Sequence, residues 1–327
     1  MAESPAIVIT YVPADCGSIF PGKSKASQAF RDADIVTKLR RAGYQSISEY
    51  QALESPATYK ASSLGSNGVR NEDLNVQVCK DVQRSLVQTL ALTGDASLPP
   101  FQLILGGECG MSPGVLSAFW QHSTQGDLHK RVGFLYIDAD TDLASPDDLN
   151  NTGIFAGMNM TNLIRSKGAL KSMQQFARPS GEALCDASNT VLFGINMSSP
   201  GNKPEHLGYL LDHGYRVISS SSVARQPIEQ AMAALRFLEE RVDIIVVHLD
   251  VDSIDPRMFP LANVPNHTGV EFHQMMQALR VILYSEKVGA LVVAEVNPNH
   301  DPGLDMTERL TDSIVDILTE RRAPRRG

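Results

Sequence analysis

The sequence predicts a single three-layer α/β domain over residues 1–327, with a parallel sheet covered by helices on both faces. Two observations support this fold class: strands and helices alternate from one end of the chain to the other, and the strands are near-continuous apolar runs. Such runs are typical of parallel strands that are buried on both faces. No repeat, low-complexity tract or interdomain linker interrupts the pattern.

The expected strands are short apolar segments. The first covers residues 6–13, and a turn near residue 43 leads back into a strand at the start of a polar, loop-like stretch, 46–70. Residues 101–120 have the pattern of a buried strand, a tight turn and a helix. Further strands are expected at 131–142, 189–199, 215–222, 243–252 and 289–298.

Apolar residues recur at helical spacing in five other segments. The expected helices cover residues 23–42, 71–92, 228–242, 272–287 and 307–322. Asn71 is a candidate N-cap of the second helix. The basic tail, about residues 321–327, is expected to be a solvated end of the chain.

The composition excludes several classes of protein. With 43% hydrophobic and 20% charged residues, the chain can bury a sizeable core and is not intrinsically disordered. Four cysteines, none in a CxxC pair, argue against a disulfide-stapled secreted fold. A net charge of -8 argues against nucleic acid as a partner, and no apolar run is long enough to span a membrane. We therefore expect a cytoplasmic protein that binds neither nucleic acid nor a membrane.

Polar side chains of one kind follow four of the expected strands. In open α/β sheets, ligands bind outside the carboxyl ends of the strands, so these residues are candidates for one site. They are Glu108 and Cys109; Asp138, Asp140 and Asp142; Asp250, Asp252 and Asp255; and Glu295 with Asn297.

Side chains alternate faces along a strand, so members of each DxD group share a side while the chain stays extended. Asp250 and Asp252 share one side, and His248 lies one step deeper on it. Two clusters of like charge at the mouth of apolar strands would repel, and a divalent cation is the ordinary remedy. A lone DxD is more often a solvated loop start, but two such pairs on separate strands, with a third strand that ends in Glu295 and Asn297, favour a metal site.

These motifs resemble those of the arginase and agmatinase family of ureohydrolases. The family's GGDH, DAHTD, DVDxxDP and EVNP segments correspond in order and spacing to four segments here. They are Gly106-Gly107-Glu108-Cys109, Asp138-Ala139-Asp140-Thr141-Asp142, Asp250-Val251-Asp252-Ser253-Ile254-Asp255-Pro256 and Glu295-Val296-Asn297-Pro298.

The resemblance implies a three-layer αβα sandwich with a mostly parallel eight-stranded sheet, assembled as a trimer or hexamer. It also implies two Mn²⁺ ions with a bridging hydroxide that attacks a guanidinium carbon and releases urea. By position, Asp138 and Asp250 would bridge the metals, Asp142 and Asp252 would each bind one, and Asp142 would also hydrogen-bond the hydroxide. Glu295 would hold the guanidinium of a small-molecule substrate.

Both metal-binding histidines of that family are missing, because Cys109 and Asp140 stand at their positions. If all six positions were ligands, five carboxylates and a thiolate would carry an excess of negative charge over two divalent ions. Protonation of Asp140 or Cys109, loss of one metal, or a nearby cation would relieve it. A thiolate shifts metal preference from Mn²⁺ toward Zn²⁺ or Fe.

Two residues allow alternative interpretations. Cys109 is either a metal ligand or a buried inert thiol. His248 is either a replacement for the lost imidazole or a satisfied core histidine.

The substrate side of the site has changed as well. Three polar positions that, by the resemblance, grip a free amino acid fall on Ala144, Ser199 and Val264, and a proton-shuttling histidine falls on Ala156. Free arginine is therefore a poor candidate substrate. Asp147, Asp148, Asn150 and Asn151 lie in the same loop and are either new ligand contacts, Asn151 in particular, or exposed turn residues.

Three functions are consistent with these residues. The first is a divergent metal-dependent hydrolase of a C–N bond in a guanidine, amidine or related group, with Asp142 and Glu295 as catalytic residues. The second is a non-catalytic family member that binds a ligand or co-assembles with an active relative. The third is a lyase or isomerase that uses Cys109 as nucleophile or acid.

Overall fold

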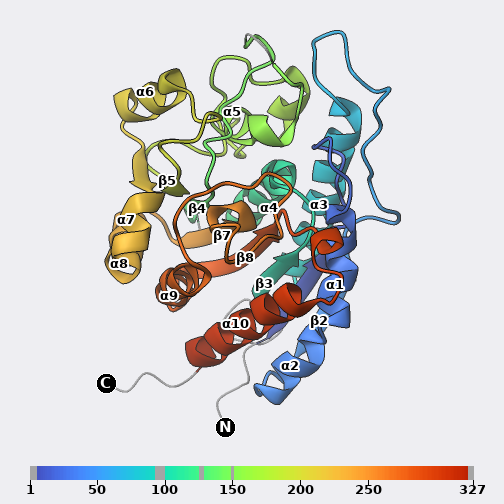
Figure 1. The fold of residues 1–327 in the computed structure, drawn as a ribbon, viewed down its shortest axis with the longest axis vertical. Helices are drawn as coiled ribbons and strands as arrows, with labels where there is room; N and C mark the ends of the chain where they lie inside the picture. The colour runs from blue at the N-terminus through green and yellow to red at the C-terminus, as the bar shows by residue number, and fades with distance from the viewer. Residues whose placement is uncertain (1–5, 93–99, 125–128, 149–150, 323–327) are drawn as a thin grey trace.

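A computed structural model describes residues 6–92, 100–124, 129–148 and 151–322. Its centre is one eight-stranded sheet in which every neighbouring pair is parallel, with the strand order β2-β1-β3-β8-β7-β4-β5-β6 (Figure 1). The strands are β1 (Ile7–Tyr11), β2 (Ile47–Gln51), β3 (Phe101–Leu105), β4 (Val132–Ile137), β5 (Thr190–Ile195), β6 (Arg216–Ser219), β7 (Ile244–Asp250) and β8 (Val288–Ala294). The predicted parallel sheet is confirmed, and it is parallel throughout.

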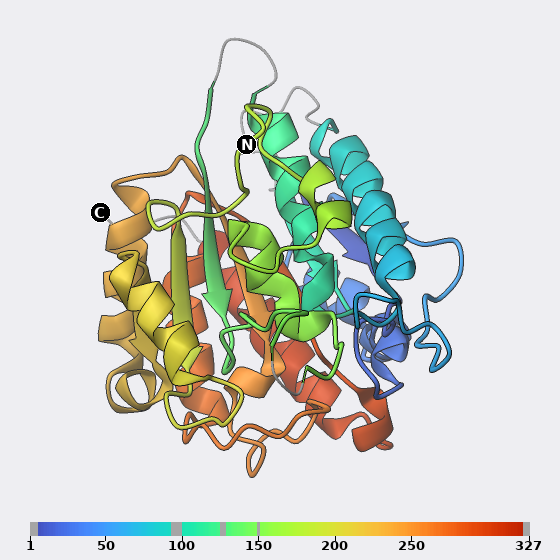
Figure 2. The ribbon, with the colours of Figure 1, turned by 90° about the horizontal axis from the view of Figure 1, so that it is seen from above.

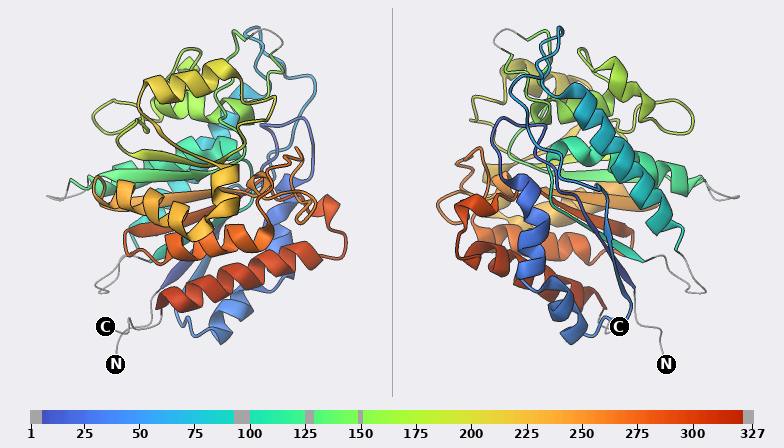
Figure 3. Two further views of the ribbon diagram at one scale, coloured as in Figure 1. Left: turned by 60° about the vertical axis from the view of Figure 1, so that its left-hand side comes forward. Right: turned by 90° about the vertical axis from the view of Figure 1, so that its right-hand side faces the viewer.

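Helices cover both faces of this sheet, which makes three layers (Figures 2 and 3). The α-helices are α1 (Ala26–Asp32), α2 (Ile35–Arg41), α3 (Glu72–Leu90), α4 (Ser112–Ser123), α5 (Asn159–Ile164), α6 (Pro204–Asp212), α7 (Ser220–Arg225), α8 (Pro227–Glu239), α9 (Phe272–Leu283) and α10 (Asp305–Arg322). Short 3-10 turns are η1 (Lys23–Lys25), η2 (Cys109–Met111), η3 (Ala156–Met158), η4 (Lys171–Gln175), η5 (Val251–Ser253) and η6 (Pro298–His300).

Each face of the sheet has its own hydrophobic core. One core joins the sheet to buried side chains of α1, α2 and α7 to α10, and the other joins it to α3 to α6. Strand β4 shows how alternation sorts the two: Leu135 and Ile137 enter the first core, and Phe134 and Tyr136 enter the second. His248 of β7 stacks on Tyr136, with ring centroids 4.9 Å apart, and so lies on the second face.

Several predicted boundaries are wrong, for local reasons. The helix expected at 23–42 is broken at Asp34, whose left-handed φ of 61° ends α1 and starts α2. The strand expected at 215–222 ends at Ser219, whose side chain accepts a hydrogen bond from the Ser222 N–H and caps α7. Asn71 precedes α3, but its side chain accepts from Lys60 and Ser63 rather than from the helix.

The expectation that the basic tail is a solvated chain end is wrong for Arg321. Arg321 lies in the last turn of α10, and its guanidinium donates to the carbonyls of Leu283, Ser285 and Val288. Residues 323–327 of the tail lie outside the described residues. No helix in the described parts of the chain is long and apolar enough to cross a membrane.

The close packing of α3 on α4 gives a test of the fold. A Cβ added at Gly114 would lie 2.3 Å from the Cys79 carbonyl oxygen, so Gly114→Ala must push the two helices apart. We expect it to lower the free energy of unfolding by roughly 1–3 kcal/mol. Gly208→Ala on α6, where nothing lies within 4 Å of the added Cβ, is the matched control. Urea denaturation that ranks the two variants equally would contradict this packing.

Candidate metal and substrate site

The four central strands of the sheet bring the predicted site residues together. β3, β8, β7 and β4 are consecutive neighbours in the sheet, and their carboxyl ends lead into Cys109, Glu295, Asp250 and Asp138 respectively. After β3, Gly106 and Gly107 take φ values of 94° and 82° and pack against the Val12 carbonyl, so the chain turns sharply before Cys109.

Four of these side chains form one compact cluster. The potential ligand atoms of Cys109, Asp138, His248 and Asp250 all lie within 4.8 Å of one another, and all four residues are buried. The Cys109 thiol donates to Asp250 Oδ2 at 2.9 Å and lies 3.7 Å from Asp138 Oδ2. Its Sγ is 3.1 Å from His248 Nε2. A thiol, an imidazole and two carboxylates therefore converge on one point.

Two backbone turns fix the aspartates of this cluster. Asp138 Oδ1 accepts the Asp140 N–H at 2.7 Å, and Asp250 Oδ1 accepts the Asp252 N–H at the same distance. In each case the other oxygen, Oδ2, is left to face Cys109. The spacing of the two DxD motifs thus orients each first aspartate through a local hydrogen bond.

His248 is held by its surroundings on the second face of the sheet. Its Nδ1 lies 3.3 Å from Ser112 Oγ, at the start of α4, and its ring stacks on Tyr136. Burial lowers the pKa of His248 to about 3, so the ring is neutral at ordinary pH. A neutral imidazole with one nitrogen held by a second residue is the form that binds metal ions.

Asp142 and Asp252 border the cluster. Tyr136 donates a short hydrogen bond to Asp142 Oδ2, and the Ala139 N–H donates to Asp252 Oδ1 at 3.1 Å. Asp142 has a left-handed φ of 48°, because β4 ends at Ile137 and the chain is no longer extended there. Both carboxylates are close enough to raise the pKa of Asp138.

The charges of this cluster are consistent with a cation. Burial, reinforced by neighbouring carboxylates, raises the pKa of Asp138 and Asp252 well above its usual value, and burial with Glu295 raises that of Asp250 to about 8. The pKa of the Cys109 thiol is raised as well, mainly by burial and then by the negative charges of Asp250 and Asp138. A divalent cation would favour the charged form of each. The donor set therefore fits a metal ion, and its mixture of S, N and O atoms suits Zn²⁺ better than Mn²⁺.

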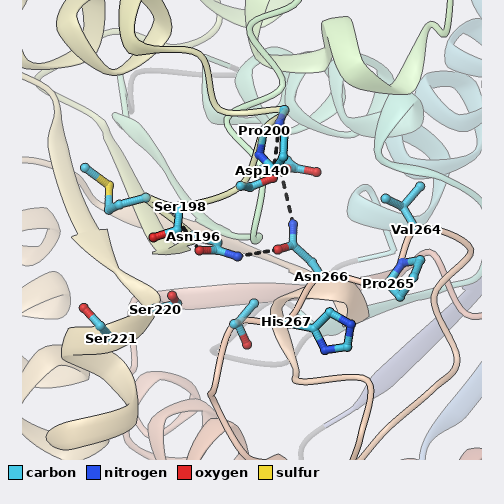
Figure 4. Close-up of a pocket in the computed structure, with 14 residues that line it drawn as sticks. Asp140, Asn196, Ser198, Pro200, Ser220, Ser221, Val264, Pro265, Asn266 and His267 are labelled. Carbon is cyan, nitrogen blue, oxygen red and sulfur yellow. Dashed lines mark hydrogen bonds between the residues drawn. The ribbon is translucent and has the colours of Figure 1, made fainter.

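Asp140, like Asp142 and Asp252, lies outside the four-residue cluster. Its Oδ1 accepts from Ser199 Oγ at 3.1 Å and from Asn266 Nδ2 at 3.3 Å, and Asn196 donates to Asn266 at 2.6 Å (Figure 4). These residues line a cleft of about 600 Å³ beside the cluster. The alternation expected over Asp138, Asp140 and Asp142 does not apply, because the strand has ended.

Two predicted substrate-side positions also line this cleft. Ser199 and Val264 both face it, the latter 50% exposed. Asn151 lies elsewhere and braces its own loop: its amide donates to the Pro146 carbonyl, and its Oδ1 accepts the Gly153 N–H. Asn150 lies outside the described residues.

Glu295 is held between two donors beside the cluster. Its Oε1 accepts the Cys109 N–H at 3.1 Å, and its Oε2 accepts from Lys23 Nζ at 2.6 Å. Lys23 also lies 3.7 Å from Glu108 Oε1. Lys23 could not be predicted from the sequence, because a lysine in a polar turn carries no local signal of burial.

The fold and the cluster together define an α/β protein with a group of side chains that could hold a metal ion at the carboxyl ends of its central strands. Comparison with known proteins identifies the family. The Arginase family model matches residues 5–319, so the chain belongs to the arginase family, whose members hydrolyse carbon–nitrogen bonds at a binuclear metal centre, usually of manganese.

Individual relatives are distant. The arginase of Staphylococcus aureus (strain MRSA252) is 22% identical over 300 residues, covering 91% of this chain and 92% of that protein. The guanidinobutyrase of Pseudomonas aeruginosa is 26% identical over 212 residues, covering 64% and 56%. The crystal structure of Bacillus caldovelox arginase aligns with a TM-score of 0.80 at 19% identity, covering 99% and 100% of the two chains.

The raised pKa values predict how the stability of the metal-free protein depends on pH. Asp250 favours its neutral form in the folded state, so its contribution is full below about pH 4 and is lost as the pH rises through about 8. We expect the Tm of chelator-treated protein to fall between pH 5 and pH 8, by about 1–2 °C for each kcal/mol lost. Asp250→Asn should flatten this fall, and a wild-type Tm that rises over the same range would contradict the charge analysis.

Proposed function

We propose that this protein is a metal-dependent hydrolase that cleaves a C–N bond of a guanidine, amidine or related group in a small molecule. The observation that carries the proposal is the convergence of Cys109, Asp138, His248 and Asp250 on one point. Membership of a hydrolytic family supports the reaction class, and relatives named arginase and guanidinobutyrase support the substrate class.

We assign the metal ligands as Cys109, Asp138, His248 and Asp250, with Asp142, Asp252 and Asp140 as candidate ligands of a second ion. In this scheme His248 supplies the imidazole that position 109 lacks, and it does so from β7, which is separated by β8 from the β3 strand that precedes Cys109. A bound divalent ion supplies Lewis-acid polarisation and lowers the pKa of a water molecule. Zn²⁺ or Fe is preferred to Mn²⁺ because the set includes a thiol.

The chain's own residues supply the remaining functions. The carboxylate of Asp142 accepts a hydrogen bond from a reacting group that carries a proton. Tyr136 donates to the same carboxylate and holds it in place. Glu295 accepts an N–H of the substrate and is oriented by the Cys109 N–H. The polar cleft lined by Ser199 and Asn266 receives the rest of the substrate. Free arginine is not the substrate we propose, because Ala144 and Val264 offer no polar side chain.

The alternative in which Cys109 acts as a nucleophile has weaker support. Burial and the neighbouring Asp250 and Asp138 raise the pKa of its thiol, whereas a nucleophilic cysteine needs a lowered one. The non-catalytic alternative is an outcome of the tests below. A trimeric or hexameric assembly and a cytoplasmic location remain predictions.

Metal analysis tests the ligand assignment. We expect protein prepared with supplementary metal to contain at least about one Zn, Fe or Mn per chain. Cys109→Ala or His248→Ala should weaken binding by at least about 10–100-fold, which is the loss typical when even a group that only hydrogen-bonds to a ligand is removed. Cys185→Ala, which removes another buried thiol far along the chain, is the matched control. Wild-type protein without metal would favour the non-catalytic alternative.

Turnover tests the catalytic assignment. With guanidino, amidino and carboxamide compounds as a panel, we expect Asp142→Asn to lower kcat by about 10²–10⁴-fold. The metal bound by the four-residue cluster should be retained, because Asp142 is not part of that cluster. Asp316→Asn, on the exposed side of α10, should leave kcat unchanged. Equal turnover of the Asp142 variant and wild type would contradict the assignment.

A further inference from the structure

Lys23 is a buried cation inside the proposed site. Its side chain is 1% exposed, and its Nζ lies 2.6 Å from Glu295 Oε2 and 3.7 Å from Glu108 Oε1. Burial acts to lower the pKa of Lys23, but the two carboxylates outweigh this effect and raise it. Among the described residues, no other basic side chain forms an ion pair with Glu108 or Glu295. The ammonium lies closer to Glu295, and burial raises the pKa of Glu108 to about 7, so Glu295 is the carboxylate that Lys23 mainly neutralises.

The chain is built to deliver Lys23 to this place. Asp15 Oδ2 accepts from the Gly22 N–H at 2.8 Å and from Ser24 Oγ at 2.7 Å, which fixes the turn on both sides of Lys23. A Cβ at Gly22 would lie 2.1 Å from Asn297 Oδ1, so the turn packs directly against the segment that follows Glu295. The position of the ammonium is thus set by backbone contacts on both sides of the pair.

Each carboxylate oxygen of Glu295 already accepts a hydrogen bond from within the protein. Oε2 accepts from Lys23, and Oε1 accepts from the Cys109 N–H. A guanidinium binds a carboxylate through two parallel N–H donors, one to each oxygen, and would bring a second cation beside Lys23. In a buried site, two like charges sharing one carboxylate repel strongly. An uncharged N–H donor, in contrast, needs only one of the lone pairs that remain on the two Glu295 oxygens.

We infer that Lys23 neutralises Glu295, so that the group accepted beside Glu295 is an uncharged primary carboxamide or ureido group rather than a guanidinium or amidinium. This inference rests on the proposed hydrolysis of a C–N bond, and of its candidate substrates it keeps only the related uncharged groups and excludes the guanidines and amidines. In the reaction, the bond between the carbonyl carbon and its NH₂ breaks and the oxygen of water bonds to that carbon. Both protons of the water go to the leaving NH₂, which gives ammonium and a carboxylate or carbamate.

The test compares two probes that differ in charge but little in shape, n-butylurea and n-butylguanidinium. Calorimetric titration measures their binding to the metal-loaded protein, and product analysis measures their hydrolysis. We expect wild-type protein to bind butylurea at least about ten-fold more tightly, and Lys23→Met to shift this ratio at least about ten-fold toward butylguanidinium. Lys25→Met, an exposed lysine in the same turn, is the matched control and should leave the ratio unchanged.

A second variant covers the case in which Lys23→Met does not fold. Glu295→Gln leaves Lys23 paired with Glu108, and we expect the preference for butylurea to persist. Tighter binding of butylguanidinium by wild type, an unchanged ratio in Lys23→Met, or no binding of either probe would overturn the inference. Preferential binding of butylurea without its cleavage would instead contradict the proposed hydrolysis alone.

Discussion

The carboxylates buried at the carboxyl ends of the central strands must be neutralised, and the rest of the site follows from that constraint. Burial raises the pKa of Asp138, Asp250 and Asp252, and neighbouring carboxylates, Glu295 in the case of Asp250, raise it further. The protein offers two ways to neutralise these charges. One is the cluster around Cys109, which could hold a divalent cation. The other is Lys23, which serves Glu108 and Glu295. The two remedies lie side by side because the Cys109 N–H also donates to Glu295.

The parallel sheet is what places these charges together. Each strand is apolar along its length and ends at the same edge, so side chains from residues far apart in sequence meet there. The neighbouring helices add the supporting contacts: α4 carries Ser112, which holds His248, and the turn before α1 carries Lys23. In this sheet β7, which carries His248, lies directly beside both β4 and β8. The set of metal ligands can therefore change locally without a change of fold.

The sequence allowed prediction of those features that depend on local pattern. Apolar runs predicted the parallel sheet, and the DxD spacing predicted the aspartates that now face Cys109. Alternation put His248 on the same side as Asp250, but the sequence left open whether it replaces the lost ligand or is a satisfied core histidine. Asp140 was placed poorly because alternation fails once a strand ends. Lys23 could not be foreseen, because its partner Glu295 is 272 residues away.

The most direct test of this account is anomalous diffraction from crystals of metal-loaded protein, measured on both sides of the zinc, iron and manganese absorption edges. The account predicts an anomalous peak within bonding distance of Cys109 Sγ and His248 Nε2, with Asp138 and Asp250 completing its coordination, while Lys23 stays on Glu295. A peak coordinated by Asp140 without Cys109 and His248, or the absence of any peak at this edge of the sheet, would contradict it.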